Sequence, residues 1–344
     1  MATRLRHISI KDYKGIDHLE LDFPAPELPG DPDVIVIGSK NGLGKTSVLE
    51  CCALSLFMLK LADSKGTKQT NTEHFNLLVR AGKTQAEISG RLTDNTKTLV
   101  RINGNSLSAI VSPSRTSSLV SQAILVFKEG RQRSVSKTDT VSKILGQNSN
   151  PVIEKEFMFF HSYRKIREGT LQAKSLFGGV TANTLTSIFK RTVVLSMMDN
   201  AGFFNEPKDQ DAHQTLGKLN NLFGLYASCR FAKLRQSEND SLELLVQPIT
   251  GGAAFNFDGL SSGQKEIITT LFLIWHETRI QPRIVLIDEP ELHLNSQWHR
   301  SFINSLIELA PQNQYIIATH SATVMDSVNQ NRRILLQKDR ETVQ

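Results

Sequence analysis

The sequence has few cysteines and no long apolar segment, and these absences limit what kind of protein it encodes. Its 344 residues include three cysteines, too few for a disulfide framework or a cysteine-rich zinc site. No run of eighteen apolar residues occurs, which excludes a membrane-spanning helix. The first ten residues include Arg4, Arg6 and His7 but no apolar signal core. We therefore expect a cytoplasmic protein without a membrane partner.

The composition is that of a folded protein with a large core. Hydrophobic residues make up 39% of the chain, and 40 basic against 34 acidic side chains give a net charge of +6. Apolar residues recur along the whole chain, so disorder is not expected as the main state. The basic excess permits a polyanionic partner without demonstrating one. The sequence has no internal repeat and no heptad run long enough for a coiled coil.

Apolar patterns predict an α/β fold. The run 34–37 is continuous, as in a strand buried on both faces, and 46–61 is apolar at nearly every position, as in a central helix. Near the end, two strands flank a helix, and such a β-α-β unit gives parallel strands. Residues 128–143 look like a loop. The other expected strands are 4–10, 18–23, 86–92, 98–102, 123–127, 156–160, 230–235, 242–248, 284–287 and 315–319, and the other expected helices are 184–198, 213–226, 264–278 and 296–309.

A glycine-rich turn between the strand 34–37 and the helix 46–61 is the strongest local signal. It points several backbone N–H groups and a helix N-terminus at one place, which suits a phosphate group. Lys45 would reach the β- and γ-phosphates of ATP, and the Thr46 hydroxyl would ligate Mg²⁺. The first glycine of the G-x-x-x-x-G-K-T pattern is replaced by Ser39. The expected nucleotide-binding residues are Ser39, Lys40, Asn41, Gly42, Leu43, Gly44, Lys45, Thr46 and Ser47.

Polar residues also follow two later strands. Asp288 and Glu289 come directly after 284–287, and ligands of open α/β sheets gather at such carboxyl ends. Asp288 would hold Mg²⁺ while Glu289 polarises the attacking water, because phosphoryl transfer requires positioning and charge neutralisation. His320 follows 315–319 and would hydrogen-bond the γ-phosphate or the attacking water.

A second anion-binding loop precedes the helix 264–278. Ser261, Gly263 and the helix N-terminus would form a nest for an anion. One nucleotide does not need two such nests from one subunit, so two subunits packed head to tail would sandwich ATP between them. The alternative is an ordinary helix start, with Ser261 or Ser262 as the N-cap.

Each of the other motifs also has a simpler interpretation. On the simpler interpretation, the loop 38–47 would be a plain glycine-rich turn beside a surface lysine. A Rossmann dinucleotide site is a further alternative, but Ser47 stands where the third glycine of its G-x-G-x-x-G pattern belongs. In the same way, Asp288 and Glu289 would belong to an acidic turn that caps a helix, and His320 would be an ordinary surface histidine. A zinc site from His293, His299 and His320 lacks metal-ligand spacing. The combination of motifs favours the nucleotide site over all of these.

The order of the motifs resembles that of the ABC-type ATPase head, a P-loop NTPase. The segment 260–264 follows the phosphate loop and precedes Asp288-Glu289-Pro290 and Thr319-His320-Ser321. Within that superfamily the chain is similar to the branch that contains RecF, SMC and Rad50 heads and the overcoming-lysogenization-defect (OLD) ATPases. The resemblance implies an α/β fold with a mixed, largely parallel sheet core, an antiparallel β subdomain and a helical lobe. The implied division is 1–90 for the first half of the core, 91–255 for inserted strands and lobe, and 256–344 for the second half.

The resemblance also implies roles for single residues. Lys45 would be the Walker A lysine, and Glu289 the catalytic base. Thr46 and Asp288 would bind Mg²⁺, and His320 would be the switch histidine. No glutamine occurs in 159–164, where the Gln loop is expected, so that role is unassigned. The signature residues acting in trans would be Ser261, Ser262, Gly263 and Gln264.

The resemblance further implies an ATPase that dimerises on ATP and acts through DNA or a partner. The chain has no room for long coiled coils, and no clustered acidic site follows His320, so we expect a separate, nuclease-like effector protein. Basic stretches at 128–143 and 164–174 would neutralise phosphates of double-stranded DNA, or form a solvated surface. An anti-phage setting is implied by resemblance only. The alternatives are a nucleotide-gated scaffold with little hydrolysis, a RecF-like DNA repair factor and a small-molecule kinase.

Overall fold

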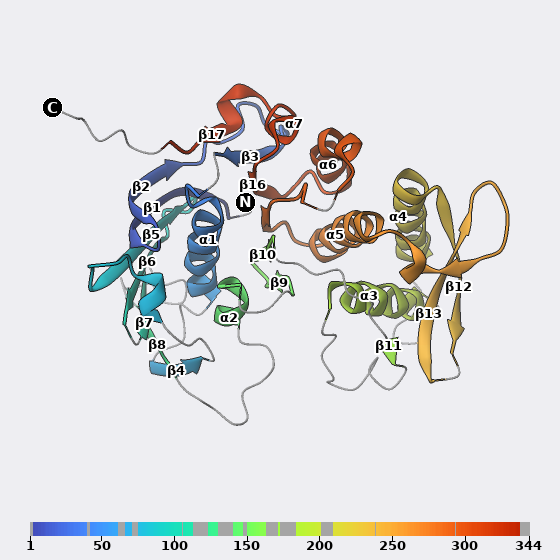
Figure 1. Ribbon diagram of the computed structural model, residues 1–344, viewed down its shortest axis with the longest axis horizontal. Helices are drawn as coiled ribbons and strands as arrows, with labels where there is room; N and C mark the ends of the chain where they lie inside the picture. The colour runs from blue at the N-terminus through green and yellow to red at the C-terminus, as the bar shows by residue number, and fades with distance from the viewer. Residues whose placement is uncertain are drawn as a thin grey trace.

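A sheet of mainly parallel strands forms the centre of the molecule (Figure 1). Its neighbouring strands pair in parallel, and only β9 joins antiparallel. The carboxyl ends of the parallel strands therefore lie along one edge. In order across the sheet, the strands are β17 (Arg333–Leu335), β3 (Asp33–Gly38), β16 (Gln314–Thr319), β15 (Ile284–Asp288), β10 (Phe157–Phe160) and β9 (Val152–Ile153).

The computed structural model describes most of the chain. For residues 60, 66–70, 123–129, 172, 200 and 209–213 it describes the backbone alone. Within these bounds, no helix combines the length and the apolar character that crossing a membrane requires. The described residues are 3–39, 42–60, 66–70, 75–104, 106–112, 123–129, 140–146, 150–162, 171–172, 184–200, 209–237, 239–292 and 294–337.

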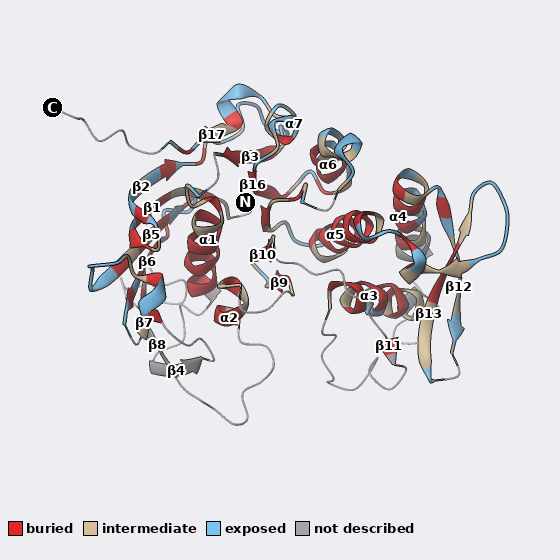
Figure 2. Cartoon of the chain, viewed as in Figure 1, coloured by how far each residue is buried: buried red, intermediate tan, exposed pale blue. Residues whose placement is uncertain are grey.

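A second, largely antiparallel sheet covers one side of the centre. Helix α1 (Lys45–Lys60) lies between the two sheets (Figure 1) and is buried along most of its length (Figure 2). In order, the strands are β2 (Ile16–Asp22), β1 (Leu5–Tyr13), β5 (Gln85–Leu92), β6 (Lys97–Asn103), β7 (Ser106–Ser112), β8 (Ala123–Glu129) and β4 (Gly66–Thr70). The short helices on this side are η1 (Phe75–Leu78) and α2 (Thr140–Ile144).

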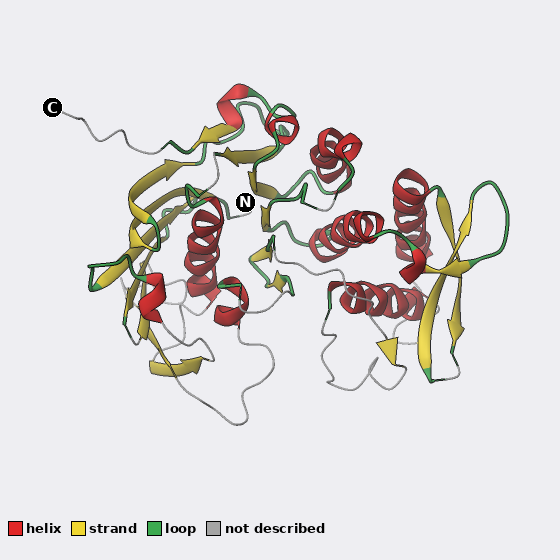
Figure 3. Cartoon of the chain, viewed as in Figure 1, coloured by secondary structure: helices red, strands yellow, loops and turns green. Residues whose placement is uncertain are grey.

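Helices and a small third sheet form a lobe on the other side (Figure 3). The helices are α3 (Leu185–Asn200), α4 (Asp209–Ala227), α5 (Ser262–Thr278) and α6 (Ser296–Leu309), with short α7 (Ala322–Met325) and η3 (Phe257–Gly259). The short helix η4 (Gln330–Arg332) lies instead against β3 of the central sheet. The strands are β11 (Leu171–Gln172), β12 (Cys229–Gln236), β13 (Ser241–Pro248) and β14 (Phe255–Asn256). β12 and β13 form an antiparallel hairpin.

The parallel sheet is buried on both faces, and alternate residues of its strands face different cores. On β3, Ile35 and Ile37 belong to the core that contains α1 and the antiparallel sheet. Val34 and Val36 belong to the core that contains α3, α4 and α5. This burial on two faces explains why residues 34–37 of the strand are all apolar. It also means that α1 and α5 pack on opposite faces of the parallel sheet.

The fold class expected from the sequence is confirmed. The β-α-β unit of β15, α6 and β16 is parallel, and the hairpin of β12 and β13 is present. The interpretation of 128–143 as a loop is wrong at both ends, because β8 continues to Glu129 and α2 begins at Thr140. Residues 91–255 supply strands to all three sheets. The division into 1–90, 91–255 and 256–344 stays a prediction.

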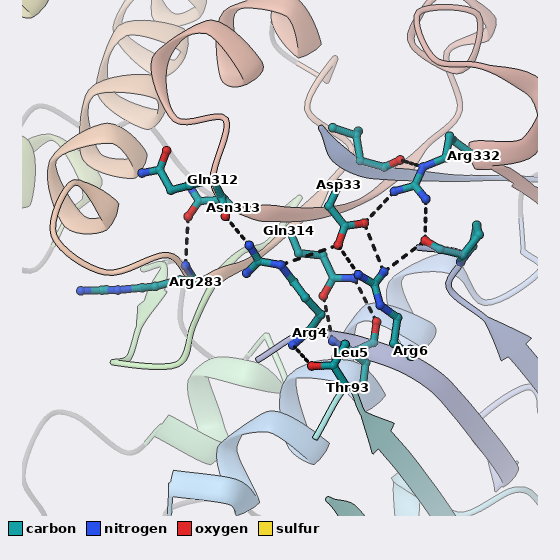
Figure 4. A network of polar contacts seen from close by, with 12 residues as sticks. Arg4, Leu5, Arg6, Asp33, Thr93, Arg283, Gln312, Asn313, Gln314 and Arg332 are labelled. Atoms are coloured by element: carbon teal, nitrogen blue, oxygen red, sulfur yellow. Dashed lines mark hydrogen bonds and ion pairs between the residues drawn. The ribbon is translucent and has the colours of Figure 1, made fainter. Parts of the chain in front are cut away.

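A carboxylate network fastens the amino-terminal edge of the parallel sheet (Figure 4). Asp33, which begins β3, is 5% exposed and accepts hydrogen bonds from Arg332 at 2.6 Å and from Arg6 at 2.7 and 3.2 Å. Arg332 also donates to the Val34 carbonyl at 2.9 Å. The network thus joins β1, β3 and η4, which lie far apart in the sequence.

Removing the carboxylate of Asp33 should destabilise the fold. In Asp33→Ala, the largely buried guanidinium of Arg332 loses its ion partner, and we expect a loss of about 3 kcal/mol in the free energy of unfolding. Urea unfolding measures this loss. Asp22→Ala is the control, because the Asp22 side chain is 79% exposed in its pair with His7, and exposed pairs contribute about 0–1 kcal/mol. Equal losses in the two variants would contradict a stabilising role for the buried network.

Candidate nucleotide site

The turn between β3 and α1 has the backbone geometry of a phosphate-binding loop. Gly42 and Gly44 have φ angles of 82° and 85°, in the left-handed region that favours glycine. A Cβ at Gly44 would also lie 3.1 Å from Ile16 of the β1–β2 hairpin, so space as well as dihedral angle selects glycine there. Helix α1 then begins at Lys45, and the first N–H groups of a helix, which have no acceptor within the helix, favour an anion.

The amino group of Lys45 contacts both the start of this loop and His320. Its Nζ lies 3.0 Å from Ser39 Oγ and 2.8 Å from His320 Nε2. Burial lowers the pKa of the Lys45 amino group, and the carboxylates of Glu289 and Asp288 act in the opposite direction. Lys45 therefore lies near His320 and the carboxylates of Asp288 and Glu289, the residues that the sequence predicted for this site.

Thr46 and Asp288 meet although 242 positions separate them in the chain. The Thr46 hydroxyl donates to Asp288 Oδ2 at 2.9 Å, and Asp288 is fully buried at the end of β15. A hydroxyl and a carboxylate are the hard oxygen donors that Mg²⁺ prefers. The donor set fits that ion.

Glu289 and His320 complete a chain of polar contacts with Lys45. His320 Nε2 is 3.0 Å from Glu289 Oε1. The parallel register explains the meeting, because Asp288 of β15 pairs with Ala318 of β16, two residues before His320. The polar residues that follow β15 and β16 therefore lie at the same edge of the sheet, as the sequence predicted.

The backbone of Glu289 is in the left-handed region, with φ of 45°. Glutamate rarely adopts this conformation, and such residues cost on the order of 1–3 kcal/mol. The Glu289 N–H donates to the Ala318 carbonyl at 2.8 Å, which holds the strained residue against β16. The surrounding sheet thus imposes the orientation of this side chain.

The second anion-binding loop predicted from the sequence, residues 260–264 and hereafter the serine loop, starts α5 with an N-cap. Ser261 Oγ accepts from the Gln264 N–H at 3.3 Å, and Gln264 Oε1 accepts from the Ser261 N–H at 3.0 Å, which makes a capping box. Ser261 and Ser262 are exposed, while Gly263 is buried. Helix α5 packs on the face of the parallel sheet opposite to α1, and no hydrogen bond or ion pair among the described residues joins this loop to the cluster around Lys45.

Comparison with known proteins identifies the family. Residues 35–326 match the family described as "AAA domain, putative AbiEii toxin, Type IV TA system". The chain belongs to this family. Among its relatives, the "Retron Vc95 probable ATPase" of Vibrio cholerae serotype O1 biovar El Tor is 22% identical over 379 residues, covering 94% of this chain and 72% of the relative.

A solved structure has the same fold as this AAA domain. It is an SMC head bound to the C-terminal winged-helix domain of ScpA, with a TM-score of 0.54 and 15% identity, and the match covers 94% of this chain and 91% of the other. The protein is therefore a P-loop ATPase with the fold of an SMC head.

The loop before α5 of this AAA domain is fastened to the helical lobe. Lys190 of α3, which is 3% exposed, makes an ion pair of 2.6 Å with Asp258 of η3. Lys265 of α5 donates to the Asp258 carbonyl at 2.9 Å. The rings of Phe189 and Phe257 lie 5.0 Å apart beside this pair. The sequence contained no local signal for these contacts, because α3 and η3 are distant in the chain.

His161 and Glu50 are buried polar residues near the site that the sequence did not single out. His161 follows β10 at the position where the Gln loop was expected, and its Nε2 bonds the Ile144 carbonyl at 2.6 Å. Burial lowers the pKa of the His161 imidazole, although the carboxylates of Glu50 and Asp288 act in the opposite direction. Glu50, one turn after Thr46 on α1, accepts from Tyr13 at 3.0 Å. A buried histidine therefore stands beside the Asp288 carboxylate of this AAA domain.

Some predicted residues lie outside the described part of the chain. Lys40 and Asn41 of the phosphate loop are among them, and so is His293 of the alternative zinc site. His299 lies 3.3 Å from Ser321 Oγ, and the described residues contain no group of three His, Cys, Asp or Glu side chains that would hold a metal. The basic stretch 164–174 is described only at 171–172.

Proposed function

We propose that this ATPase binds ATP between two heads and hydrolyses it with Mg²⁺. One observation carries the proposal. The phosphate loop, Asp288, Glu289 and His320 converge at one edge of the parallel sheet, while the serine loop starts a helix on the opposite face. Each head then has the two halves of a site but not a complete one, and a second head supplies the missing half.

The roles proposed for the side chains follow from their chemistry. The loop N–H groups and Lys45 bind the β- and γ-phosphates. Thr46 and Asp288 would hold Mg²⁺, which when bound neutralises phosphate charge. Glu289 accepts the proton of the attacking water, and its contact with His320 orients its carboxylate toward the phosphate.

The signature residues act on the nucleotide of the partner head. Ser261, Ser262 and Gly263 present a hydroxyl, backbone N–H groups and a helix N-terminus, which together favour an anion. Gln264 supports them through the capping box. The ion pair between Lys190 and Asp258 keeps this loop in place on the lobe.

Ser262→Arg should prevent ATP-dependent pairing of heads. Ser262 is exposed and is not the N-cap, so the change leaves the helix start intact and adds bulk and charge where the partner would dock. Light scattering with Mg²⁺ and a non-hydrolysable ATP analogue should give a dimer mass for the wild type and a monomer mass for this variant. Binding of a fluorescent ATP analogue to the monomer should change less than about threefold.

The control for this experiment is Thr84→Arg, which adds the same side chain at an exposed position before β5. It should dimerise like the wild type. Chelation of divalent ions with EDTA should remove the dimer of both, because Thr46 and Asp288 are proposed to hold Mg²⁺. A wild type that stays monomeric with nucleotide, or a Ser262→Arg variant that dimerises, would contradict the sandwich.

We also propose that the paired heads act on a separate effector protein. The relative from Vibrio cholerae is named as a probable ATPase of a retron, and the SMC head was solved with a domain of another protein, ScpA, bound to it. An anti-phage setting and an OLD-like role are consistent with the first of these, and double-stranded DNA is the proposed stimulus. ATP turnover measured with and without duplex DNA tests that part of the proposal.

A further inference from the structure

One carboxylate oxygen holds the turn that carries His320. Glu291 Oε1 accepts hydrogen bonds from the Thr319 hydroxyl at 2.7 Å, from the His320 N–H at 2.7 Å and from the Ser321 N–H at 3.1 Å. The three donors belong to consecutive residues at the end of β16. Glu291 itself lies two residues after Glu289, on the neighbouring strand end.

These contacts fix the histidine at its backbone. A backbone N–H at the end of a strand has lost its sheet partner and needs another acceptor. Glu291 supplies that acceptor, so the Cα of His320 is held while its ring reaches Lys45 at 2.8 Å and Glu289 at 3.0 Å. Glu291 Oε2 is buried and has no hydrogen bond among the described residues, so the carboxylate acts through one oxygen.

The same contacts are not needed to cap the following helix. Ser321 Oγ accepts from the Val324 N–H at 3.3 Å and caps α7 on its own. The Ser321 N–H has a second acceptor in Thr319 Oγ1 at 2.9 Å. Loss of Glu291 therefore removes the only acceptor that the described residues provide for the His320 N–H, while the helix start remains.

We infer that Glu291 is a positioning residue that acts through His320. It does not touch the nucleotide, and it sets the place of the imidazole between Lys45 and Glu289. The inference rests on the proposed ATP hydrolysis for its effect on rate, but the geometry of His320 is open to a separate measurement. No sequence pattern indicated this task for Glu291, because the task depends on the adjacency of β15 and β16.

A double-mutant cycle tests the inference. Glu291→Ala and His320→Ala should each lower kcat, by about 10²-fold for a misplaced catalytic group, with the KM for ATP changed less than threefold. The double variant should be no slower than His320→Ala by more than about threefold, because the positioning acts through His320. The charge of Glu291 also acts on the Lys45 amino group, and Glu291→Gln separates that effect from the positioning. Glu291→Gln keeps an acceptor at the Oε1 position and should retain most of the rate.

The ring signals of His320 give a second readout that does not depend on turnover. In histidine-labelled protein, with the signal assigned by its absence from His320→Ala, Glu291→Ala should shift the His320 resonances and Glu291→Gln should leave them close to the wild type. Circular dichroism confirms that each variant is folded.

Several results would overturn the inference. Multiplicative rate losses in the double variant would mean that Glu291 acts independently of His320. A Glu291→Gln variant as slow as Glu291→Ala would mean that its charge matters rather than its acceptor. Unchanged His320 signals in Glu291→Ala would refute the positioning directly. A wild type without turnover would refute the proposed hydrolysis, while the ring signals still decide the positioning.

Discussion

Glu289→Gln should lower ATP turnover by about 10²–10⁴-fold, the usual contribution of a general base. The amide cannot accept the proton of the attacking water, so the γ-phosphate stays attached. Lys45, Thr46 and Asp288 are unchanged, so ATP should still bind. The variant should therefore hold ATP and accumulate as a stable dimer, which light scattering with Mg-ATP measures alongside phosphate release.

Glutamine is the right replacement because of the backbone at this position. It keeps the Cβ, so the φ of 45° costs the same in both proteins and a change in rate reports the lost carboxylate. Glu87→Gln, on the antiparallel sheet, removes one carboxylate elsewhere and should leave turnover unchanged. Turnover at the wild-type rate in Glu289→Gln would show that Glu289 is not the base. ATP binding without a change in mass would favour the nucleotide-gated scaffold.

Lys45→Ala should weaken ATP binding and, through it, abolish assembly. The amino group of Lys45 is buried at the mouth of the phosphate loop, and truncating one partner of a buried charge pair costs about 2–5 kcal/mol, or roughly 30-fold to 5,000-fold in affinity. Titration of a fluorescent ATP analogue measures the affinity, and light scattering measures the assembly. Lys11→Ala removes an exposed lysine from β1 and is the control. ATP affinity equal in the two variants would exclude Lys45 as a phosphate ligand.

Local sequence patterns predicted the parts of the site that each lie within one short segment. The continuous apolar run before the phosphate loop predicted β3, and the strand ends predicted where Asp288 and His320 would meet. Strand β7 was missed because serines at 106, 108 and 112 leave only the short apolar run 109–111 to mark it. The task of Glu291 was missed because its partners lie on another strand, and sequence alone does not state which strands are neighbours.

Contacts across the lobe could not be predicted from the sequence for a similar reason. The pair of Lys190 and Asp258 depends on how α3 packs against η3, and either residue alone looks like a surface charge. Asp33 is a comparable case at the other edge of the sheet, because its partner Arg332 is 299 positions away. Such long-range pairs are set by tertiary packing, and no local periodicity marks them.

The placement of α1 and α5 on opposite faces of the parallel sheet has a genetic consequence under the proposed pairing. A chain with a defective serine loop disables the phosphate loop of the normal chain that it joins, but its own phosphate loop still meets the normal serine loop, so one of the two sites works and the allele should be recessive. A chain defective at Lys45 and a chain defective at Ser262 should complement each other. When they pair, the sound phosphate loop of one meets the sound serine loop of the other, and two inactive alleles rebuild one working site.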